Sequence, residues 1–370
     1  MCHWKYRKGN REGGPKRGPE SQDTCRRDGR IDGAGNRQVR NCVSTLFVCV
    51  TCRREGEPPA DKRQGTRLLP REFMDNSEEE EDTTNGYLIV GDVWNPDEDL
   101  DSLPWASKVY KRDLDFRRYN VPFLLNPYLS FYTSRGCPAM CTFCLWPQTH
   151  SGHRWRLRSN EDIVNEVKYV QENFPGLKEI FFDDDTFNYR EARTIALCKE
   201  FEKLDFTWSC TSRVTTSEDT LKAMKDAGAR LLIVGYESGD QQILKNIKKG
   251  ATVDMARRFT ANAHKLGLKI HADFIIGLPG ESRESIETTI NFAKELDCET
   301  IQVSLAHPYP GTEFYDHVVK NNLITLDSMT DEMGHQLPNI IYPGLDRGEL
   351  VDSVERFYSE YYFRPKAAWR

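Results

Sequence analysis

Three cysteines stand close together in one short stretch of the chain, which reads Ser134-Arg-Gly-Cys137-Pro-Ala-Met-Cys141-Thr-Phe-Cys144. Thiolates at spacings of four and three residues can surround one compact metal centre. A cubane [4Fe-4S] cluster normally takes four cysteine ligands. Three ligands leave one iron open, and an open iron can bind and activate a substrate. The spacing therefore predicts a [4Fe-4S] cluster held by Cys137, Cys141 and Cys144.

Two alternative roles for these cysteines stay open at this point. One is a zinc site, because His150 or His153 could complete a tetrahedron of three sulfurs and one nitrogen. The other is three buried thiols without any metal. The position of the cysteines favours the cluster, because they follow a predicted strand and further chemically capable residues follow the later strands. Cys49 and Cys52 have the spacing of half a zinc site, but no second pair of ligands follows them at a suitable distance.

Charged residues and glycine stand at the ends of the later predicted strands. Three adjacent carboxylates repel one another, so we expect them to face a cation, although a solvated turn would also account for them. An arginine suits a carboxylate through its planar fork of donors, and glycine lets the backbone approach a ligand closely. In chain order these residues are Asp183, Asp184 and Asp185 after the second strand, Arg213 after the third, Glu237 and Ser238 after the fourth, and Gly277 after the fifth.

An alternation of strand and helix patterns must position these residues. The predicted strands are Leu129–Ser134, Glu179–Phe182, Thr207–Cys210, Leu231–Gly235, Ile270–Ile276 and Thr300–Leu305. The helical patterns between them are Glu161–Phe174, Glu191–Leu204, Thr220–Ala227, Met255–Leu266 and Ser285–Leu296. Such alternation predicts a parallel sheet with right-handed crossovers, and places chemistry at the C-terminal ends of the strands. An open six-unit barrel and a doubly wound sheet both fit this pattern.

The motif Cys-x3-Cys-x2-Cys, with Phe143 just before the third cysteine, resembles that of the radical S-adenosylmethionine (SAM) superfamily. The resemblance implies an α/β fold, a partial (β/α)6 barrel of the TIM type, with SAM bound to the open iron of the cluster. In that superfamily SAM is cleaved to a 5′-deoxyadenosyl radical, which removes a hydrogen atom from substrate. The resemblance also implies cofactor-binding residues. They are Phe143 beside the cluster, Asp184 and Asp185 for the SAM ammonium, Arg213 for its carboxylate, Glu237 and Ser238 for the ribose, and Gly277 for the adenine.

A narrower resemblance covers roughly residues 93–366. Its motifs are Lys111–Phe123, Cys144-Leu-Trp-Pro-Gln-Thr149, Phe182-Asp-Asp-Asp-Thr-Phe187 and the ending Tyr362-Phe-Arg-Pro365. These stretches resemble the hopanoid-biosynthesis-associated radical SAM proteins of the cobalamin-binding group. The resemblance implies a lipid-linked hopanoid substrate, a role in making its cyclitol ether head group, and a reducing partner such as flavodoxin or ferredoxin. The alternatives are a radical SAM methyltransferase or methylthiotransferase on another substrate, and a zinc-stabilised α/β binding protein.

The chain divides into four predicted segments. Residues 1–85 are rich in Arg, Lys, Gly and Pro, and we expect this segment to be largely disordered. Residues 86–128 connect it to a barrel of residues 129–320, and residues 321–370 form a helical extension. Members of the cobalamin-binding group carry an N-terminal Rossmann-like cobalamin domain. Residues 1–85 lack its βαβ pattern, so we expect SAM binding without cobalamin.

Composition narrows the class of protein. The 370 residues are 38% hydrophobic and 29% charged, which is typical of a globular chain long enough for one barrel. No stretch approaches the ~20 apolar residues of a membrane span, so we expect a cytoplasmic protein. A net charge of −6 gives no reason to expect nucleic acid as a partner. Eleven cysteines, an odd number, do not form a secreted disulfide framework, and the isolated Cys198, Cys210 and Cys298 are expected to be buried.

Overall fold

A computed structural model describes residues 67–69, 88–90, 99–324 and 339–364 of the chain. The predicted low-order segment 1–85 lies outside these residues except for β1 (Arg67–Leu69), which pairs antiparallel with β2 (Leu88–Val90). The sequence predicts no strand there, so this pairing differs from the expectation. Both strands are short runs, Arg-Leu-Leu and Leu-Ile-Val, that end in the large apolar residues favoured in strands.

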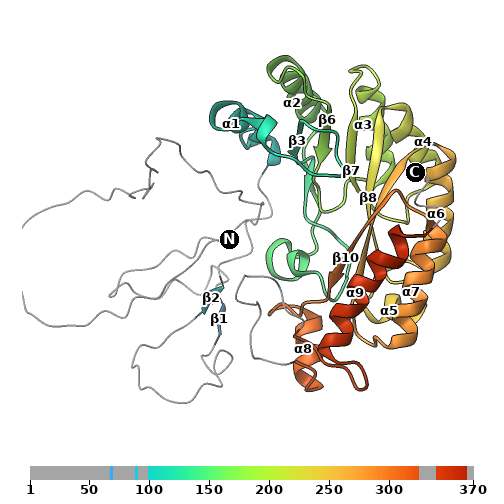
Figure 1. Ribbon diagram of the computed structural model, residues 1–370. Helices are drawn as coiled ribbons and strands as arrows, with labels where there is room; N and C mark the ends of the chain where they lie inside the picture. Colours follow the sequence, from blue (N-terminus) through green and yellow to red (C-terminus); the bar gives the residue numbers. More distant parts are fainter. Residues whose placement is uncertain (1–66, 70–87, 91–98, 325–338, 365–370) are drawn as a thin grey trace, which may run out of the picture. The chain divides into compact units, whose positions relative to one another are not determined.

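Six parallel strands form a half-barrel, and Figure 1 shows them with their connecting helices. In chain order they are β3 (Tyr128–Phe131), β6 (Glu179–Phe182), β7 (Trp208–Ser212), β8 (Ala229–Glu237), β9 (Lys269–Ile276) and β10 (Thr300–Leu305). Their order in the sheet is the same as their order in the chain. A doubly wound sheet would reverse that order at a switch point, so the open six-unit barrel is confirmed.

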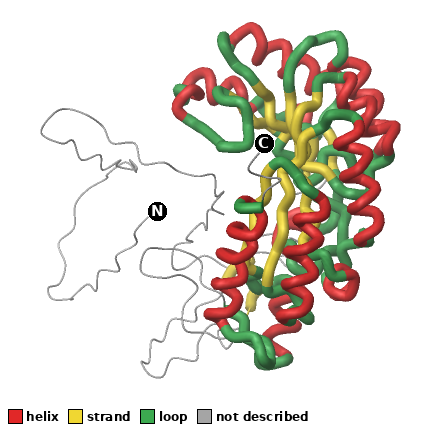
Figure 2. Tube along the Cα trace, turned by 45° about the vertical axis from the view of Figure 1, so that its right-hand side comes forward, coloured by secondary structure: helices red, strands yellow, loops and turns green. Residues whose placement is uncertain are grey.

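The helices between the strands cover the outer face of the curved sheet (Figure 2). They are α2 (Asn160–Asn173), α3 (Glu191–Phe201), α4 (Glu218–Asp226), α5 (Gln241–Asn246), α6 (Val253–Lys265) and α7 (Arg283–Leu296). The sequence predicts all of these except the short α5. Helix α2 begins where the sequence offers a capping residue. The Ser159 hydroxyl accepts a hydrogen bond from the Asp162 amide at 3.1 Å and so caps α2.

The first strand is shorter than predicted. It ends at Phe131, and Ser134 belongs instead to the two-residue strand β4 (Ser134–Arg135), which pairs with β5 (Arg156–Leu157). The reason is a long-range contact: the Thr133 and Ser134 amides donate to the Asp184 carboxylate, at 2.6 and 3.2 Å, and not to a neighbouring strand. A further helix, α1 (Ala106–Asp113), lies in the predicted connecting segment.

An aromatic cluster fixes the strands that carry the acidic loop. Phe182, Phe187, Phe201 and Trp208 are all fully buried. The ring centroids of Phe182 and Phe201 lie 5.3 Å apart, as do those of Phe187 and Trp208. Packed rings of this size contribute strongly to core stability, so β6, β7 and α3 are held as one unit beneath the loop.

The C-terminal helix α9 (Arg347–Tyr362) covers the edge strand β10. The Tyr358 hydroxyl accepts a hydrogen bond from the Val303 amide at 2.8 Å, and the Tyr362 hydroxyl accepts one from the Ile301 amide at 2.9 Å. Edge amides left without partners would invite pairing with another chain. Helix α8 (Glu313–Lys320) lies between β10 and α9 in the chain. Among the described helices, none combines the length and the apolar character that crossing a bilayer requires.

Candidate active site

The loop that follows β3 and β4 brings the three predicted cluster ligands together. Burial, followed by the neighbouring Cys141 thiol, raises the pKa of Cys144 to about 12. Burial also raises the pKa of Cys137, to which Cys141 adds. Thiols that resist losing their protons unaided become thiolates when a cation binds them. Three clustered thiols without disulfide partners are therefore a donor set that fits an iron–sulfur cluster.

The cysteine loop is held in a defined shape by its neighbours. Gly136 has φ of +86°, and a Cβ at that position would lie 2.0 Å from the Arg154 carbonyl oxygen. The Gln148 side-chain amide donates to the carbonyl oxygens of Cys141, Thr142 and Cys144 at 3.2, 3.0 and 2.9 Å. The Gln148 amide therefore links three residues of the loop. The sequence did not predict this role of Gln148. Phe143 packs against the hydrophobic core next to the cluster ligands.

The zinc alternative needs a histidine beside the three cysteines. His153 places its Nδ1 atom 2.8 Å from the Ala139 carbonyl oxygen, which leaves Nε2 as the nitrogen that a metal could bind. Across the part of the chain that the structure describes, no three His, Cys, Asp or Glu side chains converge on a point where a single metal ion could bind. Thiols that ligate three different irons of a cubane need not converge in that way. The side chain of His150, the other zinc candidate, lies outside the described residues.

The structure separates the two aspartates that the sequence assigns to the SAM ammonium. Asp184 is only 2% exposed. One of its carboxylate oxygens accepts from the Thr133 and Ser134 amides, and the other accepts from the Thr133 and Ser134 hydroxyls, at 2.5 and 2.8 Å. Burial is the largest influence on the pKa of Asp184 and raises that pKa overall, whereas Arg193 is a nearby cation that lowers it. Asp184 therefore ties the end of β6 to the start of the cysteine loop.

Asp185 lies on the other side of the chain from Asp184, toward the cysteines. Its carboxylate accepts a hydrogen bond from the Gly136 amide at 2.8 Å. Its charge contributes to raising the pKa values of Cys137 and Cys144. The side chain is exposed, so it can still receive a ligand. Of the two predicted ammonium contacts, Asp185 is the one placed beside the cluster loop.

Two cations also lie near the cysteine loop. Arg213 acts on Cys137, whose pKa it lowers against the larger effect of burial. The Arg213 guanidinium donates to the Lys249 carbonyl oxygen at 2.8 Å, and the Lys249 ammonium pairs with the Glu237 carboxylate at 2.5 Å. Burial lowers the pKa of Lys249, but Glu237 and then Cys141 outweigh it and raise the pKa overall. Lys249 was missed in the sequence because it follows α5 and not a strand.

A carboxylate within the barrel was also missed. Asp273 lies in the middle of β9, and burial, together with the charge of Glu237, raises its pKa to about 7. Lys249 opposes this shift. A lone acid in a predicted buried strand is the signal that could have identified it. Glu237, Lys249 and Asp273 thus form one electrostatic group beside the cysteines.

The remaining predicted residues are already engaged by protein groups. The Ser238 hydroxyl lies 3.1 Å from the Thr289 hydroxyl and accepts from the Asp240 amide at 3.0 Å. Gly277 has φ of +92°. Its amide donates to the Glu281 carboxylate at 3.0 Å, and its carbonyl oxygen accepts from the Tyr342 hydroxyl at 3.0 Å. The Gly277 peptide is therefore fixed from both sides, and Ser238 faces α7.

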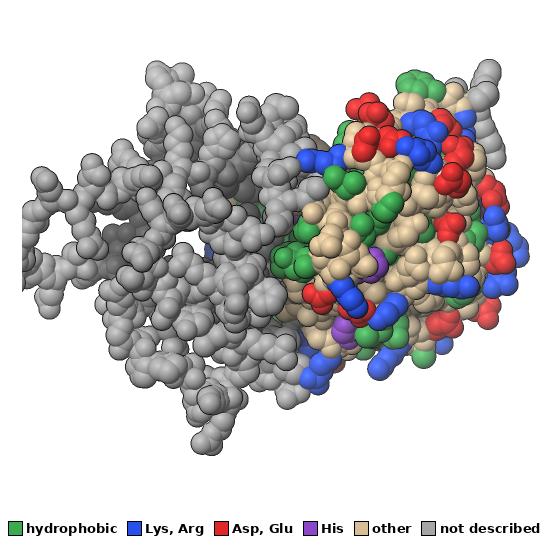
Figure 3. All heavy atoms as spheres, turned by 90° about the horizontal axis from the view of Figure 1, so that it is seen from below, with side chains coloured by type: hydrophobic (Ala, Val, Ile, Leu, Met, Phe, Trp, Pro, Cys, Tyr) green, Lys and Arg blue, Asp and Glu red, His purple; other side chains and the backbone are tan. Residues whose placement is uncertain are grey.

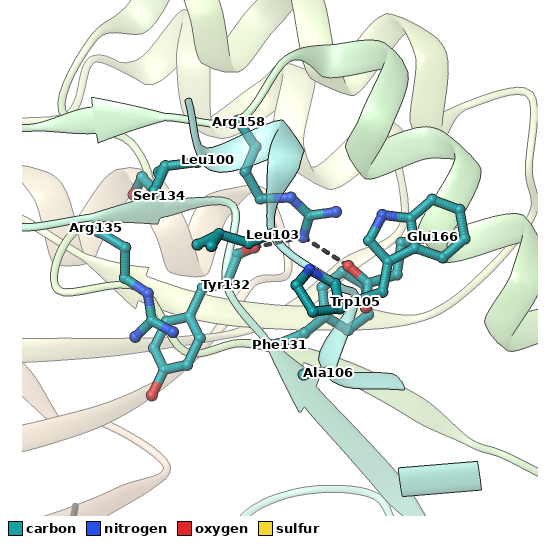
Figure 4. Close-up of a pocket in the computed structure, with 11 residues that line it drawn as sticks. Leu100, Leu103, Trp105, Ala106, Phe131, Tyr132, Ser134, Arg135, Arg158 and Glu166 are labelled. Carbon is teal, nitrogen blue, oxygen red and sulfur yellow. Dashed lines mark hydrogen bonds and ion pairs between the residues drawn. The ribbon is translucent and has the colours of Figure 1, made fainter. Parts of the chain in front are cut away.

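A small pocket of about 80 Å³ adjoins the start of the cysteine loop. Figure 4 shows the Arg158 guanidinium pointing at the Glu166 carboxylate, with Trp105 and Ala106 of the α1 region beside them. The guanidinium lies 2.6 Å from Glu166 and donates to the Tyr132 carbonyl oxygen at 2.7 Å. Sites for small ligands usually measure roughly 300–1,000 Å³, so this pocket is too small for SAM. Through these contacts Arg158 links α2 to Tyr132, which precedes the cysteine loop.

The face at the bottom of Figure 1, where α5 and α8 lie, is seen directly in Figure 3. On its described part, lysine and arginine side chains are interspersed with aspartate and glutamate, and apolar side chains lie between them. A surface of mixed sign does not create the extended field of one sign that steers a highly charged polymer.

The comparisons with known proteins agree with this geometry. Residues 131–293 match the family model described as the Radical SAM superfamily. Residues 131–293 are therefore a radical SAM domain, the kind of domain that works with an iron–sulfur cluster and SAM. Its predicted cofactors, a [4Fe-4S] cluster and SAM, are therefore those of its class.

Two curated relatives are methyltransferases by name. An uncharacterized methyltransferase of Pyrococcus horikoshii is 41% identical over 201 residues, which cover 54% of this chain and 43% of the relative. The cytidylyl-2-hydroxyethylphosphonate methyltransferase of Streptomyces wedmorensis is 27% identical over 287 residues, 73% of this chain and 53% of the relative. The chain thus spans about half the length of these relatives.

A solved structure shares the fold. The radical SAM methyltransferase TsrM of Kitasatospora setae, with cobalamin and a [4Fe-4S] cluster bound, aligns with a TM-score of 0.55 and 18% identity. The alignment covers 70% of this chain and 57% of that one.

Proposed function

We propose that this chain is a radical SAM methyltransferase that acts on a small molecule. The observation that carries the proposal is that the three thiols lie near one acid, Asp185, and near two cations, Arg213 and Lys249. SAM carries an ammonium, a carboxylate and a sulfonium on one short chain. An acid and two cations around an iron site suit these groups, and the names of the two curated relatives support methyl transfer.

The residues take distinct roles in this proposal. Cys137, Cys141 and Cys144 hold three irons of the cluster, which when bound supplies the electron that cleaves SAM. Asp185 receives the SAM ammonium, and the cations of Arg213 and Lys249 receive its carboxylate by charge-assisted hydrogen bonds. Each contact would fix one end of SAM beside the cluster.

Further contacts would hold the nucleoside. Glu237 and Asp273 offer carboxylate oxygens to the ribose hydroxyls, and the stretch around Gly277 approaches the adenine. Because the Gly277 peptide is bonded to Glu281 and Tyr342, its role is to set the shape of that stretch. We keep Phe143 as a residue that packs beside the cluster and Ser238 as one that orients Glu237.

The partners belong to the same proposal. Cleavage of SAM at a cluster consumes an electron, so a reducing partner such as flavodoxin or ferredoxin is required. We place the enzyme in the cytoplasm, without nucleic acid as a partner. That the chain binds SAM but not cobalamin remains a prediction, which equilibrium dialysis with hydroxocobalamin tests. Tight stoichiometric retention of the corrinoid would contradict it.

The second candidate is a role in making the hopanoid head group. It rests on the resemblance of the stretches Lys111–Phe123 and Cys144–Thr149 to the hopanoid-associated proteins. In that case the substrate would be a sugar attached to a hopanoid, and the reaction would contract its ring and not transfer a methyl group.

Anaerobic turnover separates the two candidates. The reconstituted protein is incubated with SAM, a reductant and candidate substrates, and both nucleoside products are quantified. Methyl transfer predicts S-adenosylhomocysteine together with 5′-deoxyadenosine, whereas ring contraction predicts 5′-deoxyadenosine alone. Formation of neither product by iron-loaded protein would contradict both candidates.

A further inference from the structure

The Gln148 side chain uses both of its polar ends. Its amide nitrogen donates to the carbonyl oxygens of Cys141, Thr142 and Cys144. Its own carbonyl oxygen accepts a hydrogen bond from the Glu313 amide at 2.8 Å. A side-chain amide has only two N–H groups, so at least one of them is shared between two carbonyls. Gln148 therefore joins the cysteine loop on one side to the first residue of α8 on the other.

A rare type of turn carries this side chain. Gln148 lies in the π-helical turn η5 (Pro147–Ser151), shortly after the last cysteine of the loop. Pro147 occupies the first position, where the missing N–H of proline leaves no helical bond unmade. Gly152 ends the turn with φ of +64°, a conformation that favours glycine. Single π-helical turns are uncommon and frequently occur at functional sites, and this one places Gln148 across the cysteine loop.

A second hydrogen bond joins the same end of α8 to the loop. The Phe314 amide donates to the Thr142 carbonyl oxygen at 3.0 Å, next to the Glu313 amide that donates to Gln148. The first amides of a helix have no partners within the helix, and here the cysteine loop and Gln148 provide two of these partners. The N-terminus of a helix carries a partial positive charge of about half an elementary charge. The positive end of α8, which is labelled in Figure 1, therefore lies against the cysteine loop.

Amide groups also reach two of the cysteine thiols. Burial raises the pKa of the Cys144 thiol, and the Trp146 amide, which donates a hydrogen bond to this thiol, opposes that shift. The Ala139 amide opposes the same effect of burial on the pKa of Cys137. Hydrogen bonds to the sulfurs are among the factors that set the reduction potential of an iron–sulfur cluster. The loop thus turns amide donors toward its thiols and gives three of its carbonyls to Gln148.

These contacts act on the charge around the cysteines. Without Gln148, three partly buried carbonyl oxygens would lose a donor, and their partial negative charge would be unscreened. A cluster that accepts an electron becomes more negative. Donors on the surrounding carbonyls and the positive end of a helix therefore stabilise the reduced state of the cluster more than the oxidised state.

We propose that Gln148 is a positioning residue that raises the reduction potential of the cluster. Its amide binds the carbonyl oxygens of the cysteine loop, and its carbonyl oxygen ties the loop to the positive end of α8. The inference rests on the proposed function, because that function requires the cluster. The cluster gains one electron, which the reducing partner loses, and a higher potential allows a weaker reductant to supply that electron.

A redox titration followed by electron paramagnetic resonance tests the proposal on the reconstituted full chain without SAM. Gln148→Met keeps the length of the side chain and removes its N–H donors and its carbonyl acceptor. At the midpoint potential of the wild type, the ratio of reduced to oxidised cluster should fall roughly tenfold, the factor that one hydrogen bond contributes. For a one-electron couple this is a shift of about 59 mV to more negative potential. The matched control is Gln171→Met, because the Gln171 amide also donates to a backbone carbonyl, that of Leu204, outside the cysteine loop; its potential should equal that of the wild type.

A second pair of variants tests the helix end without a change in the cysteine loop. Glu313→Pro removes the amide that donates to Gln148. Helix α8 should persist, because proline suits the first position of a helix and Thr312 before it is already extended, with φ of −105° and ψ of 149°. Glu313→Ala removes only the ion pair with Lys248 and is the control. Glu313→Pro should have a more negative potential than Glu313→Ala, by a smaller shift than Gln148→Met shows.

Iron content and thermal unfolding are measured for every variant. Iron-loaded Gln148→Met with the midpoint potential of the wild type, or a shift of the same size in Gln171→Met, would overturn the proposal. If Gln148→Met holds no iron, equal potentials in Glu313→Pro and Glu313→Ala would overturn it instead. Failure of the wild type to cleave SAM would refute the proposed function alone, because the potential is measured without SAM.

Discussion

Replacement of Asp184 by alanine should destabilise the fold, although the sequence places this residue among the SAM contacts. The change removes the acceptor of four hydrogen bonds from Thr133 and Ser134. It also removes a negative charge near Arg193, whose Nε and Nη1 atoms already lack hydrogen-bond partners. Each buried donor left without an acceptor costs about 1–3 kcal/mol. For a domain of this size we expect Tm to fall by roughly 10 °C.

Thermal unfolding of the apo protein and iron content after reconstitution measure the two consequences. Asp184→Ala should lower both, because the loop that carries Cys137 loses its anchor. Asp184→Asn should lower them less, since the hydroxyls of Thr133 and Ser134 can turn to suit an amide. Asp226→Ala, which breaks an exposed ion pair with Lys222, should change stability by less than about 1 kcal/mol.

The neighbouring Asp185 provides the decisive contrast. Asp185→Ala should keep stability and iron near wild type but weaken SAM binding by roughly 10- to 150-fold. If Asp184→Ala unfolds like the wild type while its SAM affinity collapses, the assignment of the two aspartates is reversed and the reasoning from burial fails.

Three further predictions follow from the site. Cys141→Ala should abolish the cluster and SAM cleavage while Cys198→Ala, in the core, keeps its iron; full iron loading of Cys141→Ala would refute the ligand assignment. Lys249→Gln should weaken SAM binding by roughly tenfold in equilibrium dialysis with Lys249→Arg closer to wild type, and equal affinities in all three would remove Lys249 from the site. Burial raises the pKa of Asp273 to about 7, so its contribution to stability is fully present below about pH 4 and is lost as the pH rises through about 7. Asp273→Asn should therefore gain stability over the wild type between about pH 4 and about pH 7, by about 1.4 kcal/mol per pH unit at most; identical pH profiles in thermal unfolding would contradict the shift.

Much of the barrel could be predicted because its strands and helices differ in periodicity and are punctuated by caps. Glu179–Phe182 and Thr300–Leu305 are predicted with the bounds that the structure gives. The end of the first strand could not be predicted, because the amides of Thr133 and Ser134 are taken by an acid about fifty residues away in the chain. Contacts of that range depend on the completed sheet.

The same limit applies to the site. The spacing of Cys137, Cys141 and Cys144 is local, so the sequence alone could predict this ligand set. Lys249 is held near the cysteines by its pairing with Glu237, twelve residues earlier. Which of Asp184 and Asp185 faces the loop depends on the direction in which each side chain leaves the strand end, and the sequence could not separate them.

The measurement that tests the central claim most directly is electron paramagnetic resonance of the anaerobically reconstituted and reduced protein, with and without SAM. The central claim is that three cysteines hold a [4Fe-4S] cluster whose remaining iron binds SAM. We predict the signal of a reduced [4Fe-4S] cluster, a change in that signal when SAM is added, and loss of both in Cys141→Ala. A signal that SAM leaves unchanged, or purified protein that retains stoichiometric zinc and no iron, would contradict the claim.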